Sequence, residues 1–190
     1  MSDQEKFFKN YYQCFRGIEI CIENKLVLPA LTLIYSGIDT FSWVAYGDIK
    51  VRERFTKWVD SHMYKEKPLS PRSIDLYAAR CAILHTLTPD STLSKNNEAL
   101  PICYAWGNAS LQELEKSIDS LKPGQVASVH LNDLFESYRR GVSHFLDTES
   151  VSEECQERMS KHYSNLDMNI VSAFNQKNAL QSRSKRASLE

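Results

Sequence analysis

Apolar residues recur at every third or fourth position along most of the chain, which is the spacing of an amphipathic α-helix. The second segment with this pattern is apolar on nearly all of its faces, which predicts a buried central helix. No segment alternates convincingly between apolar and polar residues, so the chain is predicted to be all-α. The seven helical segments run from Phe8 to Ile22, Leu31 to Ala45, Val51 to His62, Ile74 to Leu84, Leu111 to Leu121, Leu131 to Leu146 and Met159 to Phe174.

Short polar motifs mark where several of these helices begin. A capping box has serine at the N-cap and glutamate three residues later. Ser70 and Pro71 predict a further helix start, with serine as the cap and proline in the first turn. Capping boxes occur at Ser2–Glu5, Ser110–Glu113 and Ser150–Glu153.

The predicted fold is an antiparallel helical bundle of about six to seven helices in a single domain, residues 1–175. The length of 190 residues and the hydrophobic content of 42% are enough for one sizeable core. Residues 101–106 fit either a short strand or a helical turn. Residues 176–190 lose the apolar period and are polar and basic, which predicts a disordered tail.

Composition narrows the class of protein. The formal net charge is -1, so a dedicated nucleic-acid coat, which needs a basic surface, is not expected. The N-terminal segment lacks the features of a signal peptide, and no apolar run has the roughly 18 residues of a membrane span. We therefore expect a cytoplasmic protein without a membrane partner. Five scattered cysteines and five histidines without ligand spacing predict no disulfide framework, no metal and no cofactor.

Charge is distributed unevenly along this nearly neutral chain. The stretch from Lys50 to Arg80 has a net charge of +4, whereas the stretch from Asp147 to Glu157 has five acidic residues and no basic one. Two interpretations remain open for the basic stretch. It is either an ordinary solvated surface or a groove for phosphate groups near the third and fourth helices.

An arginine and a histidine separated by four residues occur together twice, as Arg80 to His85 and as Arg139 to His144. This spacing near the end of a helix in an all-α chain resembles the R-x(4–6)-H signature of the HEPN superfamily. The resemblance implies an RNA-binding homodimer with a composite cleft and metal-independent RNA cleavage, as in toxin or defence ribonucleases. Arg80 would hold the phosphate, and His85 would act as general base or acid, because imidazole titrates near neutral pH.

Position favours the first of the two matches. Arg80 and His85 close the basic stretch, and His85 falls in a last helical turn, where the helix dipole favours a positive charge. In many family members a polar residue, often asparagine, follows the arginine, whereas Cys81 follows Arg80 here. The second match lies in the middle of a helix, where Arg139, Arg140 and His144 could form an ordinary solvated face.

Other roles for these residues also fit the sequence. Arg80 could pair with a buried acid such as Asp39 while His85 donates to a backbone carbonyl, and Tyr77 could border the same cleft or pack in the core. Residues five apart lie about 140° apart around a helix, so the pair would converge only with a distorted helix end or across a dimer. The rival functions are a non-catalytic helical adaptor that binds a protein partner, and a structural dimer.

Overall fold

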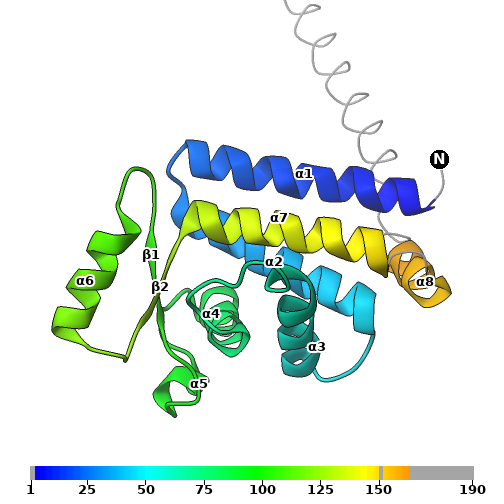
Figure 1. Cartoon of the computed structure of the whole chain (residues 1–190). Coiled ribbons are helices and arrows are strands. Elements are labelled where there is room, and N and C mark those ends of the chain that lie inside the picture. The colour runs from blue at the N-terminus through cyan, green and yellow to red at the C-terminus, as the bar shows by residue number, and fades with distance from the viewer. Residues whose placement is uncertain (1–2, 150–151, 163–190) are drawn as a thin grey trace, which may run out of the picture.

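The computed structural model describes residues 3–149 and 152–162 (Figure 1). This part of the chain forms eight α-helices, one π-helical turn and two short strands. The predicted caps at Ser2 and Ser150, the end of the last predicted helix and the predicted tail lie outside the described residues. The elements are α1 (Asp3–Glu23), α2 (Val27–Tyr46), α3 (Val51–Trp58), η1 (Val59–Met63), α4 (Ser73–Thr86), α5 (Thr92–Lys95), β1 (Ile102–Ala105), α6 (Leu111–Leu121), β2 (Ala127–His130), α7 (Leu131–Thr148) and α8 (Glu153–His162).

Helix α2 lies at the centre of the molecule, as its all-round apolar pattern predicted. It contacts α1, α3, α4, α7 and α8, and ten of its residues are buried. By length and composition α2 could also cross a membrane, but half of the relevant window is buried inside the protein. That burial is the environment of a core helix.

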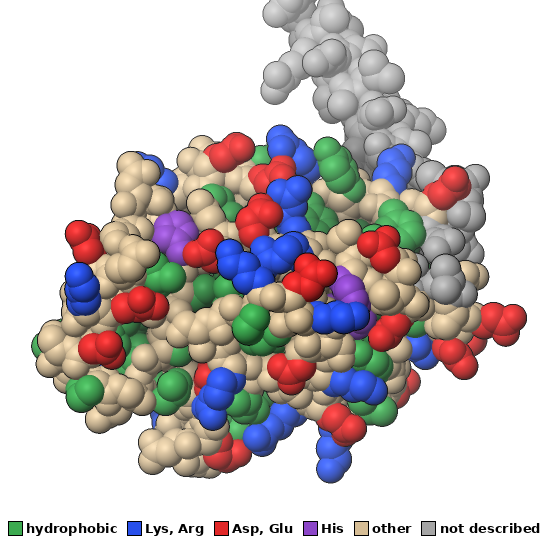
Figure 2. All heavy atoms as spheres, viewed as in Figure 1, with side chains coloured by type: hydrophobic (Ala, Val, Ile, Leu, Met, Phe, Trp, Pro, Cys, Tyr) green, Lys and Arg blue, Asp and Glu red, His purple; other side chains and the backbone are tan. Residues whose placement is uncertain are grey.

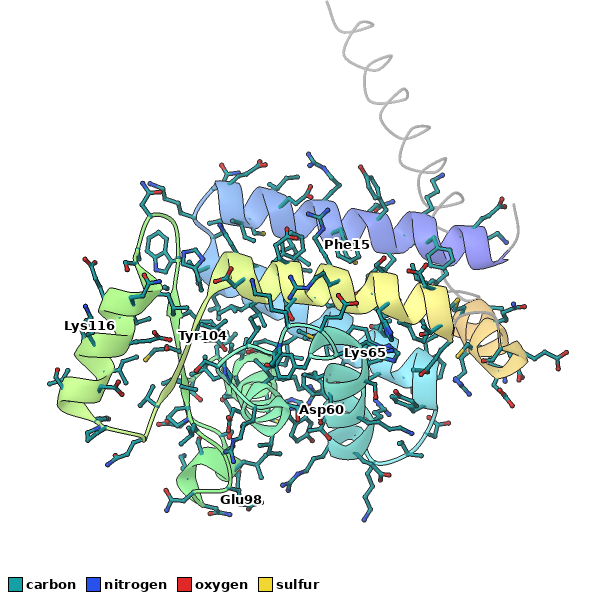
Figure 3. The ribbon with its side chains drawn as sticks, viewed as in Figure 1. Phe15, Asp60, Lys65, Glu98, Tyr104 and Lys116 are labelled. Atoms are coloured by element: carbon teal, nitrogen blue, oxygen red, sulfur yellow. The ribbon has the colours of Figure 1, made fainter. Side chains whose placement is uncertain are left out.

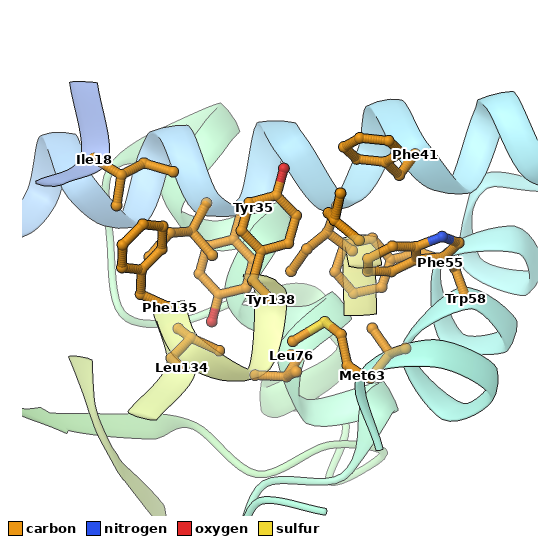
Figure 4. Packing of buried hydrophobic residues seen from close by; sticks show 14 of the residues in the cluster. Ile18, Tyr35, Phe41, Phe55, Trp58, Met63, Leu76, Leu134, Phe135 and Tyr138 are labelled. Carbon is orange, nitrogen blue, oxygen red and sulfur yellow. The ribbon is translucent and has the colours of Figure 1, made fainter. Parts of the chain in front are cut away.

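The long helices α1, α2 and α7 lie side by side, with α1 running opposite to α2, while α4 is seen nearly end-on below them (Figure 1). Side chains from these helices meet in one core that is rich in aromatic rings (Figure 4). Phe41 of α2 packs against Tyr11 of α1 at a centroid distance of 4.3 Å and against Phe145 of α7 at 5.7 Å. Such pairs add directional contacts to the burial of apolar area.

A small parallel sheet departs from the purely helical prediction. Strand β1 pairs in parallel with β2, Ile102 opposite Ala127, and α6 connects them as a crossover helix. The open choice for residues 101–106 is thereby resolved as a strand over 102–105. Each strand has four residues, too few for alternation to stand out in the sequence. The fold is mostly helical with this sheet at one end, rather than a simple bundle.

Two helix boundaries also differ from their predicted positions. Helix α4 begins at Ser73 and not at the Ser70-Pro71 signal, because the Asp75 carboxylate caps it by accepting the backbone N–H of Arg72 at 2.9 Å. The third predicted helix is α-helical only to Trp58 and continues through His62 as the π-helical turn η1. Single π-helical turns are rare and often occur at functional sites.

Candidate functional site

Arg80 on α4 reaches across to Asp39 on α2. Its Nε donates to Asp39 Oδ2 at 2.6 Å, and its Nη2 donates to the same oxygen. Burial acts to lower the pKa of Arg80, but Asp39 outweighs that effect and the net shift is upward. The other carboxylate oxygen, Oδ1, is buried without a hydrogen-bond partner among the described residues. Asp39 is therefore the carboxylate partner of Arg80, as one of the two alternatives predicted.

The same guanidinium also meets His85. Arg80 Nη1 lies 3.1 Å from His85 Nε2. Because a guanidinium only donates hydrogen bonds, the imidazole accepts at Nε2 and carries its proton on Nδ1. The two residues converge although they are five positions apart, since the long arginine side chain extends along α4 to the last turn. His85 thus contacts Arg80 rather than the backbone carbonyl that the alternative predicted.

The ion pair of Arg80 and Asp39 is partly buried, whereas the neighbouring histidine is open to solvent. The Arg80 and Asp39 side chains are 14% and 17% exposed, whereas His85 is exposed. Cys81 Sγ lies 3.9 Å from Arg80 Nη1, at the position where many HEPN proteins have a polar residue. Tyr77 packs edge-to-face on Phe55, and burial, followed by the influence of Cys81, raises its pKa. Tyr77 borders the arginine while its ring belongs to the core.

A separate apolar groove involves the same end of α4, although Arg80, Asp39 and His85 are not among its lining residues. It has a volume of about 190 Å³ and lies between α2, the end of α4 and β1, with Leu28, Leu31, Ile83, Leu87 and Tyr104 among its lining residues. Leu87, two positions after His85, is 64% exposed and has a left-handed backbone with φ of 52°. The segment that carries the exposed histidine therefore also contributes an exposed leucine to the groove.

The second arginine–histidine match is divided between two environments. Arg139 is exposed and pairs with Glu136 at 3.0 Å, as expected of a solvated face. Arg140 and His144 instead line a pocket of about 210 Å³ together with His62 and Lys65. Figure 3 shows Lys65 beside α7.

Within this pocket, two histidines from distant parts of the chain meet. His62 Nδ1 lies 2.9 Å from His144 Nδ1, and Lys65 Nζ lies 2.9 Å from His144 Nε2. His62 is 3% exposed, and burial, followed by the charges of His144 and Lys65, lowers its pKa to about 4. His62 was not predicted as a site residue, because no local motif indicates a contact between residues 82 positions apart.

Three of the basic residues between Lys50 and Arg80 have separate partners. Arg52 pairs with Glu98 at 3.2 Å, Arg72 pairs with Asp75 at 2.7 Å, and Lys57 lies over the ring of Tyr46. On the face shown in Figure 2, acidic and basic side chains are interspersed. On this face the arrangement favours a mixed solvated surface.

Comparison with known proteins found no matching family model, no matching curated sequence and no matching solved structure. Within residues 3–149 and 152–162, no group of three or more histidine, cysteine, aspartate or glutamate side chains could hold a metal ion. The geometry of the side chains is therefore the basis for assigning a function.

Proposed function

We propose that the chain is a HEPN-like RNA-binding protein that cleaves RNA without a metal ion, as a cytoplasmic ribonuclease of toxin or defence type. The observation that carries the proposal is the 3.1 Å contact between Arg80 Nη1 and the exposed His85 Nε2. A cation for phosphate and a titratable imidazole are the two groups that this chemistry needs. Asp39 fixes the guanidinium beside the imidazole.

The proposed reaction uses the ribose 2′-hydroxyl as the nucleophile. The 2′-oxygen forms a bond to the adjacent phosphorus as the bond from phosphorus to the 5′-oxygen breaks. In this step Arg80 Nη1 moves from His85 Nε2 to the phosphate, and the freed lone pair of Nε2 takes the 2′-hydroxyl proton. The remaining N–H groups of Arg80 stabilise the negative charge that develops on the phosphate. The products are a 2′,3′-cyclic phosphate and a 5′-hydroxyl.

A second copy of the chain would complete this site. The leaving 5′-oxygen needs a proton, and among the described residues of one protomer His85 is the only imidazole in contact with Arg80. In a homodimer, the His85 of the second copy supplies that proton. The apolar groove with exposed Leu28 and Leu87 next to His85 offers a surface that the second copy can cover.

The alternative function is a non-catalytic adaptor with the same fold. The observation in its favour is the coverage of Arg80, whose Nε and Nη2 are both engaged by Asp39. In that case the ion pair stabilises the packing of α2 against α4, and the apolar groove binds a different protein.

His85→Gln is expected to reduce RNA cleavage about 100-fold or more, because general acid–base catalysis typically contributes 10²–10⁴-fold. Arg80→Gln is expected to reduce it about 100-fold through the loss of charge stabilisation. The assay follows a mixed RNA substrate in EDTA, with thermal unfolding to show that each variant is folded. Arg139→Gln is the matched control, since Arg139 is exposed and pairs with Glu136. Equal cleavage by all four proteins, or none by the wild type, would support the adaptor instead.

A further inference from the structure

The pocket between η1 and α7 is built by a directional chain of hydrogen bonds. Lysine only donates, so Lys65 makes His144 accept at Nε2 and carry its proton on Nδ1. His144 Nδ1 then donates to His62 Nδ1. The proton of His62 is consequently on Nε2, which lies 3.6 Å from Glu149 Oε1 and 3.4 Å from the Tyr46 hydroxyl. Both imidazoles are neutral in this arrangement.

The charges of the pocket lining are balanced, and one further carboxylate lies at its buried end. Lys65 and Arg140 provide two positive charges, Glu66 and Asp147 provide two negative ones, and Glu149 adds a negative charge beside His62 Nε2. Arg140 has no hydrogen-bond or ion-pair partner among the described residues, although it is partly buried. Arg140 and His144 are one helical turn apart on α7, so they present their donors on the same face.

Protonation of His144 would change this balance. An imidazolium donates from both nitrogens, so it can no longer accept from Lys65, and the lysine ammonium is released. The pocket then gains one positive charge, and the donors of Lys65, Arg140 and His144 all become available. We propose that this pocket binds a phosphate-type oxyanion, with binding coupled to protonation of His144.

Two further observations support this assignment. Burial first of all lowers the pKa of His62 to about 4, so this imidazole stays neutral near pH 6, and His144 is the less buried member of the pair. His62 also lies within the π-helical turn η1, a backbone conformation that frequently occurs at functional sites. The site uses neither Arg80 nor His85, so it stands independently of the proposed cleavage function.

Isothermal titration with sulfate tests the proposal on the full chain, because sulfate remains a dianion across the pH range in which imidazole titrates. At constant ionic strength, we expect sulfate to bind about tenfold more tightly at about pH 6 than at pH 8, with uptake of up to about one proton. Proton uptake is measured by comparing buffers of different ionisation enthalpy. Equal affinity at the two pH values, or no binding at pH 6, would overturn the proposal.

The variants His144→Gln and Arg140→Gln locate the site. Both are expected to lose most of the sulfate binding at pH 6, while Arg139→Gln, on the same helix but paired with Glu136, keeps it. Arg140→Gln leaves the hydrogen-bond chain intact. It therefore still tests the site if His144→Gln fails to fold. Binding that persists in both pocket variants refutes the site.

The source of the oxyanion is identified by comparing the binding of three ligands. These are inorganic phosphate, a short RNA with a 5′-phosphate and the same RNA with a 5′-hydroxyl. Tighter binding of the phosphorylated RNA identifies an RNA end, and equal binding of free phosphate identifies a small anion.

Discussion

Acidification from pH 7 to pH 5 is expected to lower the free energy of unfolding of the wild type by about 2 kcal/mol more than that of His62→Gln. The folded-state pKa of His62 is about 4, whereas an unfolded histidine has a pKa near 6.5. Between these values the unfolded chain binds more protons than the folded one. The contribution of His62 is therefore fully present above about pH 6.5 and is lost as the pH falls toward 4.

Urea unfolding at several pH values between 5 and 7 measures this difference. Arg139→Gln is the control, because Arg139 is exposed, pairs with Glu136 and does not line the pocket around His62. Parallel curves for the wild type and His62→Gln would show that the buried imidazole does not titrate as its surroundings indicate.

Gly37→Ala is expected to destabilise the protein by about 2–3 kcal/mol, the upper part of the range for overpacked cores. A methyl group at position 37 of α2 would meet the hydroxyls of Tyr11 and Tyr138 and would lie 2.7 Å from Tyr138 Cζ. Both tyrosine rings are buried, so neither can swing aside into solvent. The substitution forces α1 or α7 away from the central helix.

Thermal unfolding checks this result, with an expected fall in Tm of about 5–10 °C for a chain of this size. Gly17→Ala is the matched control. At that position in α1 the added methyl would lie 3.3 Å from the end of the Leu33 side chain, which can move. The control is expected to be neutral or stabilised by up to about 1 kcal/mol, because alanine favours the helix over glycine. An equal loss of stability in both variants would argue against a special close approach at Gly37.

The helical part of the fold could be predicted because it depends on local sequence patterns. Apolar spacing identified the long helices, and the Ser110 cap of α6 accepts the backbone N–H of Glu113 at 3.3 Å as predicted. The strands could not be recognised, since each pairs over only four residues with a partner 25 positions away. The predicted start of α4 at Ser70-Pro71 was wrong. The helix begins at Ser73, where the Asp75 carboxylate accepts the backbone N–H of Arg72.

At the two arginine–histidine matches, too, local patterns could be predicted and long-range contacts could not. The contact of Arg80 with Asp39 was one of the predicted alternatives, because both lie on predicted helices. The pocket around His144 depends on the approach of η1 to α7 at Gly141. A methyl group there would lie 2.7 Å from Met63 Cγ and 3.0 Å from Trp58 Cη2. Such a tertiary approach, and the π-helical turn that delivers His62, leave no periodic signal in the sequence.

The chemistry of the RNA ends tests the proposed attack by the ribose 2′-hydroxyl at Arg80 and His85. Fragments produced by the wild type in EDTA should carry a 2′,3′-cyclic phosphate on one end and a 5′-hydroxyl on the other, and His85→Gln should produce neither. Fragments with a 3′-hydroxyl and a 5′-phosphate, or undiminished cleavage by His85→Gln, would contradict the account.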